Sequence, residues 1–173
     1  MASNIHITAA KGSLVERMGK KIECEWSGVA TLIDACNAQT AKPFAELSDR
    51  DFADGLINPV LEISDALRTA LAVSDRIIVV ISQGYLGDWH RVPEAAASAA
   101  IVGLMRSLAL EYMVNDIIFN IIALPLGAAE DDAALIEEAA WLVELLLKSS
   151  AISGQILTLD HGRSLKMTKA RRR

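Results

Sequence analysis

The segment Arg76–Ser82 reads RIIVVIS and contains five consecutive β-branched residues. Such residues lose side-chain freedom in a helix and fit the pleated surface of a strand. An apolar run without polar alternation is typical of a strand that is covered on both faces, which occurs mainly in parallel sheets. We therefore expect a central, parallel strand here, and parallel neighbours require crossover helices.

The rest of the chain supplies such a pattern. Strands are expected at residues 4–9, 29–35, 117–123 and 155–159, and helices at 14–19, 48–73, 93–114 and 131–149. The long helix should be interrupted near Asn58-Pro59, since proline cannot donate a backbone hydrogen bond. Strands and helices that alternate in this way predict an α/β fold with a doubly wound parallel sheet. We expect one domain over residues 1–173, ending in a basic, flexible tail at about 163–173.

Composition and charge exclude several classes of protein. With 52% hydrophobic residues and a mean hydropathy of +0.30, the chain must bury much apolar surface, some of it in an interface. The net charge of −5 gives no electrostatic footprint for a nucleic-acid partner outside the tail. The apolar runs at 117–126 and 139–147 are shorter than the roughly 20 residues of a membrane span. Cys24 and Cys36 lack metal-ligand spacing, which favours reduced thiols in a cytoplasmic protein.

Four segments, in this order, resemble the short-chain dehydrogenase/reductase family. They are RIIVVIS, AAASAAIVGLMRSLALE (95–111), FNIIALPLG (119–127) and SGQILTLDHG (153–162). GLMRSLALE and SGQILTLDHG are the most specific of them. The resemblance covers roughly residues 29–162 and implies a truncated Rossmann-like sheet of the family's type that lacks part of the dinucleotide-binding half.

The family's catalyst is a tyrosine followed four residues later by a lysine, which lowers the pKa of the tyrosine. Counted back from GLMRSLALE, the tyrosine position is Glu94 and the lysine position is Ser98. Ser82 matches the family's catalytic serine, and Asn58 matches its helix asparagine. No lysine occurs between Lys42 and Lys148. The resemblance therefore implies vestigial positions and no catalytic residue.

Cofactor binding is expected to be lost as well. A dinucleotide needs a glycine-rich turn at a helix N-terminus, but Thr8–Ser13 keeps one glycine where the family pattern has three. Two further strands of the family, which hold the adenosine half, would have to fit into about 15 residues before the strand at 29–35. The family's Asn-Asn-Ala-Gly turn corresponds to Asp34–Gln39, without its glycine. The segment after Pro125 is too short for the family's substrate lid.

Other polar residues have plainer explanations. Tyr85 follows the central strand, and without a lysine beside it, a phenol of ordinary pKa about 10 is poorly tuned for proton transfer at neutral pH. Glu94 fits the first turn of a helix, where an acid favours the helix dipole. His6, His90 and His161 are scattered, so we expect no metal site.

The resemblance implies a catalytically inactive subunit that assembles with an active NAD-dependent member of the family, as a heterotetramer. The NAD would then belong to the partner. Such a non-catalytic subunit is found in the heterotetrameric dehydrogenase of anaerobic toluene degradation, which oxidises 2-[hydroxy(phenyl)methyl]succinyl-CoA. Two alternatives stay open: a divergent active reductase that uses Ser82 with Tyr85 or Glu94, and a scaffold homodimer without an active relative.

Overall fold

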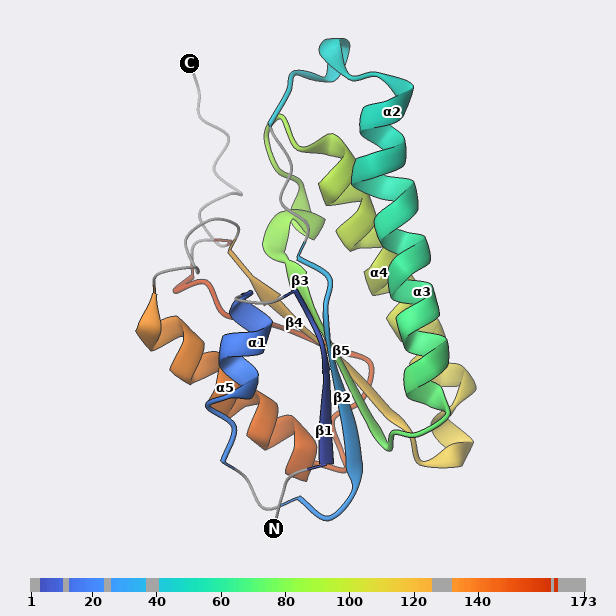
Figure 1. Cartoon of the computed structure of the whole chain (residues 1–173), viewed down its shortest axis with the longest axis vertical. Helices are drawn as coiled ribbons and strands as arrows, with labels where there is room; N and C mark the ends of the chain where they lie inside the picture. The colour runs from blue at the N-terminus through green and yellow to red at the C-terminus, as the bar shows by residue number, and fades with distance from the viewer. Residues whose placement is uncertain are drawn as a thin grey trace.

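The computed structural model describes residues 4–10, 13–23, 26–36, 41–125, 132–162 and 164. Its strands form one parallel sheet, and they lie side by side in chain order (Figure 1). They are β1 (Asn4–Thr8), β2 (Val29–Asp34), β3 (Arg76–Ser82), β4 (Ile118–Leu124) and β5 (Gln155–Thr158). The expected central strand is confirmed, since β3 lies between β2 and β4 and six of its seven residues are buried.

The helices also follow the expected order. They are α1 (Leu14–Gly19), α2 (Asp49–Phe52), α3 (Asn58–Leu71), α4 (Val92–Glu111) and α5 (Ala133–Lys148), with single 3₁₀ turns at Phe44–Glu46 (η1), Gln83–Leu86 (η3) and Met113–Asn115 (η4). The predicted interruption near Asn58-Pro59 is a π-helical turn, η2 (Ala53–Ile57). Because Pro59 has no N–H to donate to the residue four positions earlier, the wider π turn accommodates it without breaking the helix.

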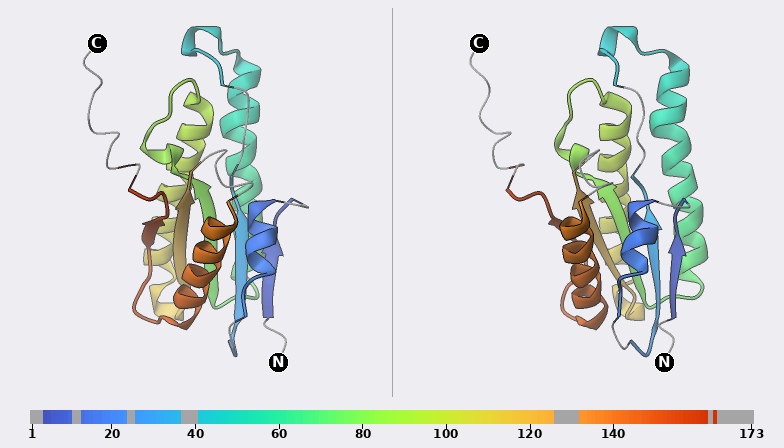
Figure 2. Two further views of the ribbon diagram at one scale, coloured as in Figure 1. Left: turned by 90° about the vertical axis from the view of Figure 1, so that its left-hand side faces the viewer. Right: turned by 60° about the vertical axis from the view of Figure 1, so that its left-hand side comes forward.

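Two helices cover each face of the sheet, which confirms the doubly wound arrangement (Figure 2). On one face, Val15 and Met18 of α1 and the apolar side of α5 pack against Leu32, Val80 and Ile122. On the other face, α3 and α4 pack against Ile33, Val79 and Ile121. Successive β-strand residues point to opposite faces, so both sides of β3 reach a core.

The connections between strands do not all have the same hand. Every crossover moves one strand along the sheet in the same direction, but α1 and α5 lie on the face opposite α3 and α4. The connections through α3 and α4 are right-handed, so those through α1 and α5 are left-handed (Figure 2). Left-handed crossovers between parallel strands are rare. β1 is also left as an edge strand and is mostly exposed.

Helix α4 is covered on one side in the single chain. Its inward side is buried by the sheet and by η3, and an outward stripe is exposed: Ala99, Ala100, Gly103, Arg106, Ser107 and Leu110. By length and composition alone, α4 could span a membrane. Seven of its residues are buried inside the protein, as in the core helix of an α/β fold. Apart from Ser164, the predicted tail lies outside the described residues.

Candidate functional site

Ser82 is the last residue of β3, and its side chain has a local structural role. Its Oγ accepts a hydrogen bond from the backbone N–H of Gly84 at 2.9 Å and so caps the turn η3. The residue is 2% exposed. A serine that takes part in proton transfer must reach the substrate, and here the hydroxyl is enclosed and occupied by its own turn.

The two residues that the resemblance assigns to the family's tyrosine and lysine positions are buried too. Glu94 lies in the first turn of α4, as expected, and Ser98 lies one turn later on the same side of the helix. They are 4% and 3% exposed. Neither supplies a phenol or a cation. Tyr85 is half-buried in η3, and its hydroxyl lies 3.4 Å from Oγ1 of Thr158 in β5, so this phenol is held towards the last strand.

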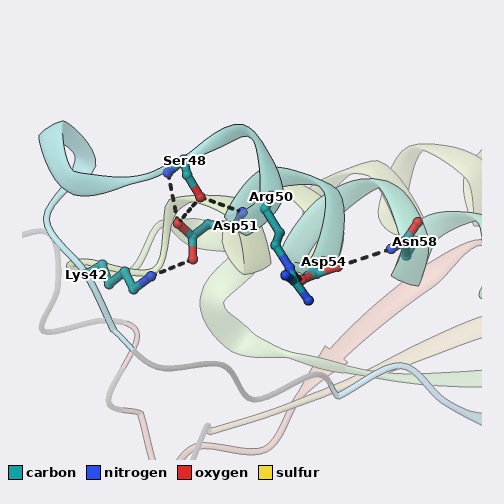
Figure 3. A network of polar contacts seen from close by, with 6 residues as sticks. All are labelled: Lys42, Ser48, Arg50, Asp51, Asp54 and Asn58. Atoms are coloured by element: carbon teal, nitrogen blue, oxygen red, sulfur yellow. Dashed lines mark hydrogen bonds and ion pairs between the residues drawn. The ribbon is translucent and has the colours of Figure 1, made fainter.

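Asn58 is not brought together with Ser82. Its side chain is exposed, and its Nδ2 donates to Oδ1 of Asp54 one turn earlier, at 3.4 Å (Figure 3). A helix asparagine on the outer surface cannot relay protons from a buried centre. The position of Asn58 therefore does not support its match to the family's helix asparagine.

Lys42 is the lysine nearest in sequence before the lysine-free segment, and it is engaged elsewhere. Its Nζ lies 2.6 Å from Oδ1 of Asp51, whose other oxygen accepts hydrogen bonds from the N–H and hydroxyl of Ser48 (Figure 3). These contacts complete a capping box at the start of α2. The lysine and the Ser48 donors hold the pKa of Asp51 well below its usual range. Lys42 therefore stabilises a helix terminus and leaves Tyr85 without a lysine partner in the contacts described.

A cavity of about 380 Å³ lies where the chain leaves adjacent strands towards opposite faces of the sheet. β1 leads to α1 on one face and β2 leads towards α3 on the other, and ligands of open α/β sheets bind at such a switch point. The cavity, here called the β1–β2 pocket, is lined by Thr8, Ala9, Ala10, Asp34, Ala35, Cys36, Pro59, Glu62, Ile63 and Ala66. Its described lining contains two carboxylates and no cationic side chain.

The polar groups of the β1–β2 pocket are partly occupied. Asp34 Oδ1 accepts the backbone N–H of Cys36 at 3.0 Å. Cys36 is exposed as a residue, but its Sγ lies 3.8 Å from the carbonyl oxygen of buried Val80. Burial of the sulfur, together with the charge of Asp34 and a hydrogen bond to it, raises the pKa of the Cys36 thiol. A protonated thiol is a weak nucleophile, so the raised pKa does not favour Cys36 as a nucleophile.

The start of α1 is where a dinucleotide's phosphates would be expected. Ser13 caps this helix by accepting the N–H of Glu16 at 3.3 Å, and the carboxylate of Glu16 lies in the first turn. The Ser13 side chain caps one backbone N–H of this terminus, and the first-turn acid disfavours an anion there. Lys11 and Gly12 of the predicted turn lie outside the described residues, as do residues 37–40 and 126–131. The described lining of the β1–β2 pocket and the first turn of α1 place the carboxylates of Asp34, Glu62 and Glu16 in this region.

Comparison with solved structures is informative for the fold. Acetoin dehydrogenase from Enterobacter cloacae matches with a TM-score of 0.73 and 15% identity, over 94% of this chain and 97% of its own. A SCOR enzyme from Clostridium thermocellum matches with a TM-score of 0.69 and 16% identity, over 95% and 94%. The chain has a short-chain dehydrogenase/reductase-like fold. A 4-hydroxyisoleucine dehydrogenase complexed with NADH and succinate matches less closely, with a TM-score of 0.62, 19% identity and coverage of 78% and 69%.

No protein-family model and no curated protein sequence matches the chain. At 15–19% identity, the likeness to these dehydrogenases establishes the arrangement of strands and helices only. The sequence indicates Ser82 and Glu94 as candidate positions, but it does not predict the cavity of the β1–β2 pocket. The signal available was the pair of acidic residues, Asp34 after one strand and Glu62 in the following helix, but their proximity depends on the tertiary fold.

Proposed function

We propose that this chain is a non-catalytic subunit that assembles with an active, NAD-dependent short-chain dehydrogenase/reductase. The observation that carries the proposal is the burial of three side chains. The sequence resemblance assigns Glu94 and Ser98 to the positions of the family's tyrosine and lysine, and both are at least 96% buried, as is Ser82. A catalytic group has to contact the reacting atoms, and packing of these three side chains leaves no room for that.

The β1–β2 pocket supports the assignment of NAD to the partner. The pyrophosphate of a dinucleotide carries negative charge, and it is bound by backbone N–H groups at a helix N-terminus or by cationic side chains. Here Asp34 and Glu62 line the cavity and Glu16 lies in the first turn of α1. Like charges at short range oppose binding. We expect the isolated chain to bind no NAD.

Two exposed surfaces support an assembly. The outward stripe of α4 carries small residues around Gly103, where an added Cβ would meet no atom within 4 Å, together with the charged Arg106, and it ends at Leu110, which is 75% exposed. On the opposite face of the sheet, Trp141 and Leu145 of α5 are 65% and 41% exposed. Small residues allow close approach of another helix, and an exposed tryptophan is a frequent interface anchor. Both surfaces fit contacts with another subunit.

The proposed complex is a cytoplasmic heterotetramer in which the partner holds the NAD and the substrate. A narrower form of the proposal takes the partner to be the 2-[hydroxy(phenyl)methyl]succinyl-CoA dehydrogenase of anaerobic toluene degradation. It rests on the likeness in kind to that enzyme's non-catalytic subunit, and no described residue selects an aromatic acyl-CoA. An oxidation assay of the reconstituted complex with this substrate decides it.

The main test is co-expression with a full-length dehydrogenase of the family encoded next to this chain. Size-exclusion chromatography should show one complex, whose activity exceeds that of the partner alone. Ala100→Arg, on the outward stripe of α4, should separate the subunits. Ala72→Arg makes the same substitution at an exposed position on neither surface and should leave the complex intact. Elution of the two chains as separate species would contradict the proposal and would favour the scaffold homodimer.

A second test separates the proposal from an active reductase. NADH fluorescence is titrated against the isolated chain, and we expect no saturable change. If the chain were a divergent enzyme, NADH would bind and turnover would be lost in Tyr85→Phe or Glu94→Gln. Saturable binding with turnover by the isolated chain would overturn the non-catalytic assignment.

A further inference from the structure

The free edge of β1 lacks the features that usually protect an edge strand. β1 is the first strand of the described sheet and pairs only with β2, from Asn4 opposite Val29 to Thr8 opposite Ile33. Its sequence, NIHIT, contains no lysine, acid or proline and no bulge. Natural proteins protect exposed edges with such residues or cover them, because unpaired backbone groups otherwise recruit another strand. No strand of the described part of the chain pairs with this edge.

The two faces of β1 have different chemistry. Ile5 packs with the core beneath α1, and Ile7 lies so close to α1 that a Cβ at Gly19 would collide with it. Ile7 is nevertheless 38% exposed. His6 and Thr8 point to the other face, where they line a cavity of about 550 Å³ beside α3. Any strand that pairs with β1 has to place apolar side chains on the α1 face and polar ones on the α3 face.

We propose that the occupant of this edge is β1 of a second copy of the chain, paired antiparallel about a two-fold axis at His6. In this register Ile5 lies opposite Ile7 of the second copy, and Asn4 lies opposite Thr8. Both apolar pairs then fall on the α1 face and both polar pairs on the α3 face. A two-fold contact requires such a self-complementary surface. β1 contains no lysine, arginine or acid, and the axis places the two His6 side chains opposite each other.

The positions of the helices allow this contact. α1 contacts both β1 and β2, so its axis lies about half a strand spacing, or roughly 2.4 Å, inside β1. Across a new strand pair of about 4.8 Å, the two α1 axes lie about 10 Å apart, which is an ordinary packing distance for helices. Each α1 would cover the exposed part of Ile7 from the other copy. The second copy therefore adds a packed helix pair to the backbone hydrogen bonds.

The α3 face gives a consistent result. α3 contacts β2 and β3, so it lies about one and a half strand spacings from β1, and the two α3 axes would be about 19 Å apart. A gap of this width leaves Asn4, His6 and Thr8 of both copies open to water. Their polarity suits that environment. The surfaces on α4 and α5 remain free, so the contact joins two copies whether or not the proposed partner binds.

Cysteine pairs test the register directly, in a chain that carries Cys24→Ser and Cys36→Ser. Two copies of His6→Cys face each other at about 5 Å between Cα atoms, within the range of a disulfide. Two copies of Thr8→Cys lie four residues apart, roughly 14 Å, and so do two copies of Asn4→Cys. When each variant is oxidised by itself under mild conditions, we expect only His6→Cys to form a cross-linked dimer. Asn4→Cys and Thr8→Cys should cross-link only when mixed. Cross-linking of Thr8→Cys alone at the rate of His6→Cys would overturn the register.

Sedimentation of the unmodified isolated chain tests the dimer itself. We expect a dimer whose dissociation constant rises at least tenfold in His6→Lys, because two lysines then meet at the axis. Circular dichroism checks that this exposed substitution leaves the fold intact. Ser107→Lys adds the same charge at an exposed site on α4 and should not change the dissociation constant. A monomeric chain, or a dimer that His6→Lys leaves unchanged, would overturn the proposal. Loss of partner binding would refute only the proposed function.

Discussion

Replacement of Ser82 by alanine distinguishes a structural serine from a catalytic one. Its Oγ is the acceptor for the N–H of Gly84 at 2.9 Å, in surroundings where the residue is 2% exposed. A buried donor that loses its partner costs about 1–3 kcal/mol. In a domain of this size, each kcal/mol lowers Tm by about 2–4 °C. Ser82→Ala should therefore lower the free energy of unfolding by about 1–3 kcal/mol and Tm by about 2–12 °C.

Urea denaturation of the isolated chain measures this loss, and Ser107→Ala is the matched control. The Ser107 hydroxyl donates to the carbonyl of Gly103 at 3.0 Å on an exposed part of α4. Its removal leaves no buried group unpaired, and alanine favours the helix, so we expect a change within about 0.5 kcal/mol. In the reconstituted complex, Ser82→Ala should leave activity per intact complex unchanged. Unchanged stability combined with lost oxidoreductase activity would refute the structural role.

Three further outcomes are expected. Lys42 lowers the pKa of Asp51 relative to the unfolded chain, so the ionised carboxylate stabilises the fold above about pH 4, and this stabilisation is lost as pH falls further. Denaturation at pH 6 and at pH 3 measures the free energy of unfolding. Between these two pH values, that free energy should fall less in Asp51→Asn than in the unmodified chain. Asn120 is 1% exposed; its Nδ2 donates to the carbonyl of Ile152, and its Oδ1 accepts the N–H of Gln155 at 3.2 Å. Asn120→Ala should lower the free energy of unfolding in urea by about 2–4 kcal/mol. An unchanged free energy of unfolding would contradict this structural role. Trp141 is 65% exposed, so Trp141→Ala should change the free energy of unfolding by less than about 1 kcal/mol. The same substitution should weaken partner binding at least tenfold, measured by calorimetry. Unchanged affinity would exclude α5 from the interface.

The sequence predicted the elements more accurately than it predicted their surroundings. The range of α1 and that of β3 are as expected, because Ser13 caps the helix and the β-branched run of the strand excludes a helix. The sequence predicts an interruption of the long helix near Asn58. It does not predict that a π turn joins α2 to α3 there, since the geometry of this turn depends on packing against α4. Burial of Glu94 was also missed: an acid in a first helical turn usually faces water, and only the tertiary contact of α4 with η3 encloses it.

The hand of the β1–α1–β2 connection links the fold to the proposed dimer. A left-handed crossover is rare because a right-twisted strand and a right-handed helix pack back onto the sheet more readily in the other sense. If the two strands that the family resemblance places after α1 lay beyond β1, the connection through α1 would run outwards and be right-handed. In the described sheet no strand lies beyond β1, so α1 leads inwards to β2 and β1 stands at the edge. This arrangement does not account for the left-handed connection through α5. The position of β1 at the end of the described sheet thus relates the hand of its connection to its unpaired edge, which is the edge that a second copy would pair with.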